Sequence, residues 1–313
     1  MNNTAISENA TKTINKVSYT FIDKNLDRAV NPQVKLIRKI STDTVIVEQP
    51  LQISLSWLAQ DLIKRKVFTI TMRTPGHDYF LILGLLHSEG VIKQLTDIES
   101  ITLTSADIAG EGQQNEWLVH FTNGFIPDLS LIERYMMSYS SCGLCGTTSL
   151  KKLQLKTTIN LANTAHKGAL AVQSLLLLSN KMRQEQGLFD QTGGVHGVAL
   201  FDQSLTIQHL HEDIGRHNAV DKVIGALLSK NHAGNESENE QPQVAPLWIL
   251  LVSGRISFEI VQKTIMAGIS VLIGVGAPSD LAIQAAKQFD LTLIGFVSNT
   301  GFNVYHGDWR LTT

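Results

Sequence analysis

The chain has 313 residues, of which 43% are hydrophobic and 17% are charged, and its formal net charge at pH 7 is −2. This length predicts about two domains of roughly 150 residues, each large enough to bury its own core. The balanced charge gives no sign of a nucleic-acid partner, and the longest apolar runs are about half of the roughly 20 residues in a membrane-spanning helix, so we also expect no membrane partner.

Residues 1–25 are polar and show no periodic pattern, which predicts a flexible tail. They also lack the apolar run of a secretory signal. We therefore expect a cytoplasmic protein, in which the reducing environment disfavours a structural disulfide.

Residues 26–140 predict an α+β domain. Runs rich in β-branched residues indicate strands, and a dense apolar run that stops at Gly90 indicates a helix. The expected elements are strands over 43–55, 67–74, 99–105 and 116–122, and helices over 79–90 and 129–141.

Residues 141–164 are expected to form a loop and linker that contain both cysteines of the chain, Cys142 and Cys145, in the sequence "SSCGLCG". A cytoplasmic C-x-x-C pair is more often redox-active, metal-binding or catalytic than structural. The small neighbours suit an accessible loop in which a thiolate attacks sulfur. Thiol chemistry and zinc binding both stay open at this point.

A zinc site needs more ligands than this pair supplies. A structural site takes about four, so two chains would have to share it. A nucleobase-deaminase site pairs H-x-E with P-C-x-x-C. His87-Ser88-Glu89 matches the first half, but it lies about 50 residues upstream of the cysteines, and Ser141 stands where the proline belongs.

Residues 165–313 predict a layered α/β domain, because apolar strands alternate with helices and such strands pair in parallel. A long helix is expected over 171–187, ended by Gly187, and residues 231–243 read as an exposed connection. The other expected elements are strands over 197–202, 205–211, 247–253, 270–276 and 291–298, and helices over 218–230, 258–269 and 280–290.

Ligands of such a sheet gather at the carboxyl ends of its strands. The segments that follow the three apolar strands there, together with residues 211–218 before a helix, suit a phosphate-bearing ligand, because Arg216 and Arg255 can donate two hydrogen bonds each. A purely structural reading stays open: Arg216 could pair with Glu212 or Asp213, and His196 and His217 could be structural histidines.

Five motifs in order, "SSCGLCG", "TGGVHGVAL", "EDIGRHNAVDKVIG", "SGRISFEIVQK" and "GFNVY", resemble the FdhD family of sulfurtransferases that serve formate dehydrogenase. The resemblance covers roughly residues 40–306. It implies a cytoplasmic homodimer that takes persulfide sulfur from a cysteine desulfurase. The sulfur passes to molybdenum bis(molybdopterin guanine dinucleotide), a client ligand that then goes to formate dehydrogenase. The resemblance further implies a C-terminal three-layer domain related to the cytidine deaminase fold, without a bound metal.

The resemblance also implies the residues of the site. Cys142 would carry the persulfide, and Cys145 would assist or resolve it. The segment that matches the family's nucleotide-contacting stretch, with Arg255, Arg216 and His217 nearby, would bind the cofactor. Its residues are Phe296, Val297, Ser298, Asn299, Thr300 and Gly301.

Two positions depart from the family pattern. The sequence "GAPS" at 276–279 stands where S-A-P-T is common in the family. Ser298 stands where the family often has an arginine after the sequence G-F-x. Two other functions stay open, namely a zinc-dependent deaminase of the same fold and a cofactor chaperone that moves no sulfur. The segment "GFVSNTGFNVY" could also be only a hairpin between two strands.

Overall fold

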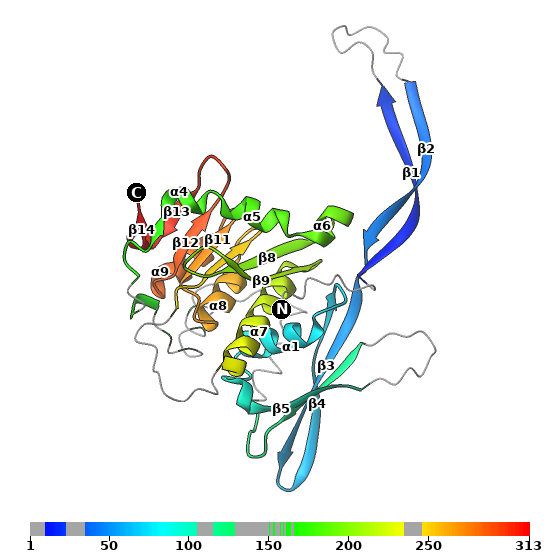
Figure 1. The fold of residues 1–313 in the computed structure, drawn as a ribbon. Helices are drawn as coiled ribbons and strands as arrows, with labels where there is room; N and C mark the ends of the chain where they lie inside the picture. Colours follow the sequence, from blue (N-terminus) through cyan, green and yellow to red (C-terminus); the bar gives the residue numbers. More distant parts are fainter. Residues whose placement is uncertain are drawn as a thin grey trace.

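The computed structural model describes residues 10–22, 35–104, 115–128, 161–163, 166–234 and 246–313, with four single residues between 150 and 159. The helix expected over 129–141 and both cysteines lie outside these residues, as does most of the expected linker. Among the described residues the chain forms an N-terminal half built on a four-stranded sheet and a C-terminal half built on a six-stranded one (Figure 1).

The four-stranded sheet of the N-terminal half has the order β4-β3-β6-β5 and is covered on one face by helix α1. Leu51, Ile53 and Phe68 of the sheet pack with Leu81 and Leu85 of the helix in one core. The elements are β3 (Gln49–Ala59), β4 (Leu62–Arg73), α1 (Asp78–Ser88), the 3-10 turn η1 (Leu95–Asp97), β5 (Ile98–Leu103) and β6 (Glu116–Phe121). The expected α+β character of this half is confirmed.

Strands β1 (Thr11–Ile22) and β2 (Lys35–Ile46) form an antiparallel ribbon, which we call the arm, and it projects from the body (Figure 1). The flexible tail expected over 1–25 is therefore wrong for residues 11–22. Polar side chains occupy both faces of the ribbon because both faces meet water, so the alternation that marks a half-buried strand is missing. The base of the arm is anchored where Ile46 packs against Leu188 and Val195.

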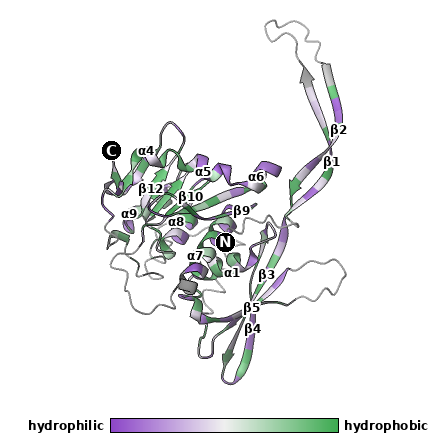
Figure 2. Cartoon of the chain, viewed as in Figure 1, coloured by the Kyte–Doolittle hydropathy of each residue, from purple (hydrophilic) through white to green (hydrophobic). Residues whose placement is uncertain are grey.

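The six-stranded sheet of the C-terminal half has the order β13-β12-β11-β10-β8-β9, in which β10, β11 and β12 are parallel. Helices α7, α8 and α9 cover one face and α4 and α5 the other, so successive strand residues such as Ile249 and Leu250 enter different cores (Figures 1 and 2). The expected three-layer α/β architecture is confirmed. The finer likeness to cytidine deaminases stays a prediction.

The elements of this half follow in chain order. They are η2 (Leu161–Asn163), β7 (Leu170–Ala171), α4 (Val172–Leu175), α5 (Leu178–Gln184), α6 (Gly187–Thr192), β8 (His196–Phe201), β9 (Ile207–Asp213), α7 (Arg216–Gly234), β10 (Ile249–Val252), α8 (Phe258–Met266), β11 (Val271–Gly274), α9 (Asp280–Gln288), β12 (Thr292–Gly295), β13 (Asn303–His306), η3 (Asp308–Arg310) and β14 (Leu311–Thr312).

The single helix expected over 171–187 is wrong, because the structure divides this stretch into α4 and α5 and starts α6 at Gly187. The carboxylate of Glu212 accepts hydrogen bonds from the N–H groups of Leu188 at 2.8 Å and Phe189 at 2.9 Å. Gly187 by itself indicates the end of a helix. A new helix begins there instead, because the distant side chain of Glu212 caps its first N–H groups.

The two halves meet where α1 crosses α7. A Cβ atom added to Gly84 of α1 would overlap the carbonyl oxygen of Asp221 in α7, and one added to Gly225 of α7 would overlap the carbonyl oxygen of Phe80 in α1. The two helices therefore touch through their backbones, and only glycine fits at either position. The domain boundaries drawn from the sequence stay predictions.

We expect Gly84→Ala and Gly225→Ala each to destabilise the protein by at least about 2 kcal/mol, because the added methyl groups must push two packed backbones apart. Helix propensity alone predicts the opposite sign, a gain of about 1 kcal/mol per substitution. Urea unfolding measures the difference, with Ser229→Ala on the same helix as the control. A stabilised alanine variant would show that the helices do not pack this closely.

Candidate functional site

The segments expected to bind a ligand lie along one edge of the six-stranded sheet. The parallel strands β10, β11 and β12 are neighbours, as the sequence predicted, and their carboxyl ends meet there. Because β8 is antiparallel to both β10 and β9, the start of β8 at His196 and the end of β9 at Asp213 reach the same edge. Four strand spacings of about 4.8 Å separate β12 from β9, or about 19 Å in all.

Backbone hydrogen bonds join the loops of this edge into a continuous floor. The N–H of Phe296 donates to the carbonyl of Gly276 at 3.3 Å, and the N–H of Gly276 donates to the carbonyl of Gly254 at 3.1 Å. A Cβ atom on Gly276 would lie 2.9 Å from the backbone nitrogen of Arg255. The glycine at this departure from the family pattern therefore lets two neighbouring loops close together.

Residues 296–301 form one end of this floor. Phe296 has a positive φ of 58° and a side chain that is 48% exposed, whereas Val297 is buried. A left-handed conformation costs a non-glycine residue of order 1 kcal/mol, and such strain is common at functional positions. The segment also connects the antiparallel strands β12 and β13, as the hairpin alternative expected.

Ser298 shapes the loop from within. Its N–H donates to the carbonyl of Gly301 at 2.9 Å, and its hydroxyl accepts from the N–H of Thr300 at 3.3 Å. Its hydroxyl also lies 3.1 Å from the Gly301 carbonyl oxygen. A serine in place of the arginine therefore holds the loop closed and brings no positive charge to it.

A polar cluster forms the other end of the floor, where helices α7 and α8 begin. His217 Nε2 lies 3.3 Å from Ser257 Oγ, which joins the first turn of α7 to the residue before α8. His196 on β8 completes the cluster, and the charge of Arg216 acts on both histidines. Arg255 is exposed on the loop between the two ends of the floor.

The two carboxylates that the sequence offered as partners of Arg216 are engaged elsewhere, although the charge of Glu259 on α8 acts on Arg216. Asp213 pairs with Lys222 at 2.7 Å, and Glu212 caps α6. Burial, with the added charges of Lys263 and Arg216, lowers the pKa of His217 to about 4, and burial together with Arg216 also lowers the pKa of His196. At neutral pH both imidazoles are therefore uncharged hydrogen-bonding groups beside a guanidinium.

The loop of residues 254–257 lies between the two groups of residues that the sequence assigned to the site, in contact with Gly276 on one side and with His196 and His217 on the other. Arg255 lies beside the loop that carries Gly276, next to residues 296–301. His217 lies on the other side of the same loop, with its Nε2 3.3 Å from Ser257 Oγ, and Arg216 directly precedes it. His196, whose role the sequence left open, and Ser257 join them. The position of Ser257 directly before an apolar helix, typical of an N-cap, is the one signal that could have found it.

The H-x-E sequence of the zinc alternative lies inside the seam between the two halves. Ser88 donates to Asp221 at 3.1 Å, Glu89 is 3.8 Å from Lys263, and His87 is buried. The part of the chain that the structure describes contains no group of three or more side chains able to hold a metal ion. In the same part, no helix is both long and apolar enough to cross a bilayer.

We expect His217 to make stability depend on pH. Its folded-state pKa of about 4 lies below the ordinary value of 6.5. Between these two pH values the unfolded chain therefore binds a proton at His217 that the folded chain does not bind. The contribution of His217 is complete above about pH 6.5 and is lost as the pH falls towards 4, with a slope of up to about 1.4 kcal/mol per pH unit. Guanidinium unfolding at about pH 7 and about pH 5 should show a shallower loss for His217→Gln than for wild type. Equal losses would contradict the lowered pKa.

Comparison with known proteins finds one family and relatives that match most of the chain. The sequence model of the FdhD/NarQ family matches residues 46–312. The sulfur carrier protein FdhD of Streptomyces avermitilis is 39% identical over 273 residues, which cover 86% of this chain and 89% of that protein. The protein of the same name from Sulfolobus acidocaldarius is 39% identical over 269 residues, covering 86% of this chain and 91% of the relative.

A solved structure shares the fold. The crystal structure of a protein from Desulfotalea psychrophila, assigned as a formate dehydrogenase accessory protein, superposes with a TM-score of 0.62. Its sequence is 21% identical, and the match covers 95% of this chain and 99% of that one. At this identity the likeness is one of fold.

Proposed function

Because the chain belongs to the FdhD/NarQ family, we propose that it is a sulfur carrier in the maturation of formate dehydrogenase. The single observation that supports this most is the extent of the family match, which spans residues 46–312 and so includes Cys142 and Cys145. The edge of the C-terminal sheet at the carboxyl ends of β10, β11 and β12, which we call the ligand edge, can hold an anionic cargo.

We assign the sulfur transfer to the cysteine pair. The Cys142 thiolate attacks the terminal sulfur of a persulfide on a cysteine desulfurase, so that the desulfurase leaves as a thiolate and Cys142 holds the sulfur. The Cys145 thiolate then attacks Cys142 Sγ, and the terminal sulfur departs with the bonding electrons to the metal of the cargo. This leaves a Cys142–Cys145 disulfide, which a cellular dithiol must reduce before the next cycle.

The cargo in this proposal is molybdenum bis(molybdopterin guanine dinucleotide), bound along the ligand edge as a substrate. Phe296 is exposed enough to stack on a base, while Arg255, Arg216 and the N–H groups in the first turn of α7 can meet phosphate. The two arginines lie on different loops of the edge, which suits a ligand that carries several phosphates rather than one.

Formate dehydrogenase is the proposed recipient of the cargo, and the cytoplasm is the proposed compartment, since reduced thiols persist there. A cofactor chaperone that moves no sulfur would use the same edge. It differs from the carrier in one respect, because its activity would survive loss of Cys142.

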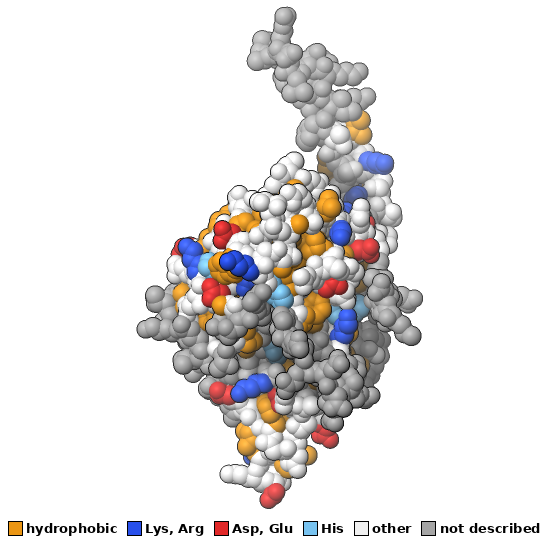
Figure 3. Space-filling view, turned by 60° about the vertical axis from the view of Figure 1, so that its left-hand side comes forward, with side chains coloured by type: hydrophobic (Ala, Val, Ile, Leu, Met, Phe, Trp, Pro, Cys, Tyr) orange, Lys and Arg blue, Asp and Glu red, His pale blue; other side chains and the backbone are white. Residues whose placement is uncertain are grey.

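The proposed homodimer finds support in the arm. Val17, Tyr19 and Ile40 lie on one face of the ribbon with exposed fractions of 45%, 56% and 63%, and among the described residues no third strand pairs with it. Two-stranded ribbons are marginally stable by themselves. The two strands carry five basic residues and one acidic one, which leaves a formal charge of −6 on the rest of the chain. Figure 3 shows acidic and basic side chains interspersed on one face of the body. The body of a second copy therefore has a net charge opposite to that of the arm.

Incubation with a cysteine desulfurase and cysteine should add the mass of one sulfur atom to the wild type and to Cys145→Ala, but not to Cys142→Ala. Intact-protein mass spectrometry measures this. Labelling confined to Cys145 would exchange the two roles. A Cys142→Ala variant that still activates formate dehydrogenase would favour the chaperone.

Binding of GDP, a stand-in for the nucleotide half of the cargo, should weaken at least tenfold in Gly301→Leu. No atom lies within 4 Å of a Cβ built on Gly301, so the new side chain fills ligand space without straining the protein. Calorimetry should show a loss of about 1.4 kcal/mol or more with little change in melting temperature. The control is Gln203→Leu, on the turn at the opposite edge of the same sheet. Unchanged affinity in Gly301→Leu would remove residues 296–301 from the site.

Sedimentation should give a dimer for the wild type and a monomer for Val17→Lys/Ile40→Lys, because the two charges would stand in the buried face of the contact. Ile37→Lys, on the opposite face of the same ribbon, is the matched control and should stay dimeric. A dimer that survives the double substitution would move the interface away from the arm.

A further inference from the structure

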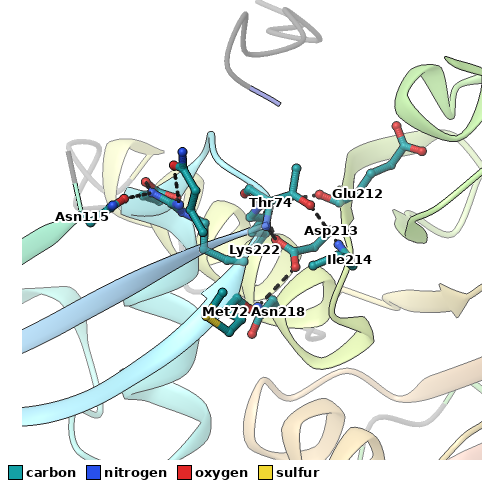
Figure 4. Close-up of polar contacts among 11 residues, drawn as sticks. Met72, Thr74, Asn115, Glu212, Asp213, Ile214, Asn218 and Lys222 are labelled. Carbon is teal, nitrogen blue, oxygen red and sulfur yellow. Dashed lines mark hydrogen bonds and ion pairs between the residues drawn. The ribbon is translucent and has the colours of Figure 1, made fainter. Parts of the chain in front are cut away.

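A buried ion pair lies beneath the turn of residues 213–215, which leads into Arg216 and His217 at the start of α7. Lys222 Nζ is 2.7 Å from Asp213 Oδ2, and the two side chains are 1% and 0% exposed (Figure 4). Lys222 also donates to the carbonyl of Thr74 at 2.9 Å. Thr74 belongs to the N-terminal half, directly after β4, so the pair joins the two halves of the chain.

Asp213 uses both carboxylate oxygens to hold the turn. Oδ1 accepts from the N–H of Gly215 at 2.8 Å and from Asn218 Nδ2 at 3.2 Å. Oδ2 accepts from the N–H of Thr74 at 3.1 Å. The first contact reaches two residues ahead, as in an Asx turn, and sets the direction in which the chain enters α7.

Thr74 holds the same turn from the other side. Its hydroxyl accepts from the N–H of Ile214 at 3.0 Å, and Asn218 donates to the carbonyl of Met72 at 2.7 Å (Figure 4). Ile214 and Gly215 are thus fixed by one carboxylate below them and by residues of the N-terminal half beside them. The next two residues along the chain are Arg216 and His217.

Asp213 is fully buried and cannot touch a ligand, although it pairs in register with His196 of the polar cluster. We propose that Asp213 and Thr74 are positioning residues, which aim Arg216 and His217 at an anionic ligand on the sheet edge. Lys222 balances the charge of Asp213, so the carboxylate orients the turn without cancelling the positive charge of Arg216. The inference rests on the proposed function only in taking that edge as a phosphate-binding surface.

The direction in which Asp213→Asn changes the affinity for GDP distinguishes a positioning role from a purely electrostatic one. Asp213→Asn removes a negative charge close to a cationic site, so Coulomb attraction alone predicts tighter binding of an anion. It also puts an N–H group, or a weaker acceptor, opposite the N–H of Thr74, so the turn loses its anchor. Positioning therefore predicts weaker binding, at least tenfold for GDP, which corresponds to about 1.4 kcal/mol.

Thr74→Val tests the same idea in a variant of equal volume that leaves every charge in place. It removes the acceptor for the Ile214 N–H and nothing from the sheet edge, and we expect GDP affinity to fall at least threefold. Ser88→Ala is the matched control, because it removes one buried hydrogen bond to Asp221 across the same seam without touching the turn. It should lower the melting temperature and leave GDP affinity unchanged.

Calorimetry with GDP, at a temperature well below the melting midpoint of each variant, supplies the readout, since loss of stability alone leaves affinity unchanged there. Wild-type affinity in Thr74→Val, tighter binding in Asp213→Asn, or equal losses in Thr74→Val and Ser88→Ala would each overturn the proposal. If wild type itself does not bind GDP, the ligand edge and this inference fall together, while the sulfur transfer is judged separately by labelling of Cys142.

Discussion

Helices α1 and α7 touch backbone to backbone, and both halves of the structure take their positions from that contact. Gly84 and Gly225 allow the approach, because a side chain at either position would overlap a main-chain carbonyl group. At such close range small shifts along the helix axes are blocked by atoms on both sides. The contact therefore fixes where the N-terminal sheet lies relative to the C-terminal one, and with it the place of every residue that crosses between them.

Charged residues flank this contact where an ordinary core would be apolar. Asp221 pairs with Lys263 at 2.9 Å on one side of α7, and the next residue, Lys222, pairs with Asp213 on the other. Burial raises the pKa of Asp221 to about 6 even beside Lys263, which shows how strongly desolvation opposes its charge. Because desolvation offsets most of the attraction in such pairs, their main effect is to specify one arrangement. A carboxylate has a few directions in which it can be satisfied, whereas apolar surfaces can slide.

This specificity bears on the ligand edge. Its floor comes from local rules, since parallel strands bring their carboxyl ends together and glycines let the loops close. The orientation of Arg216 and His217 needs more, because α7 begins at a sheet corner where the chain could enter at several angles. Thr74 and Met72 supply that orientation from the other half of the chain, more than 130 residues earlier. The halves therefore act as one unit at the site, although the sequence reads as two domains.

The sequence by itself determined whatever depends on neighbouring residues: the apolar strands of the C-terminal sheet, their parallel order, and the placing of residues 254–257 and 296–301 at one edge. The prediction from sequence failed where a residue or strand far away in the chain determines the local structure. The arm was missed because β1 finds its partner strand across residues 23–34, and α6 because Glu212 caps it from β9. Local pattern carries propensity and periodicity, whereas hydrogen-bond partners and packing distances exist only once the chain has closed on itself.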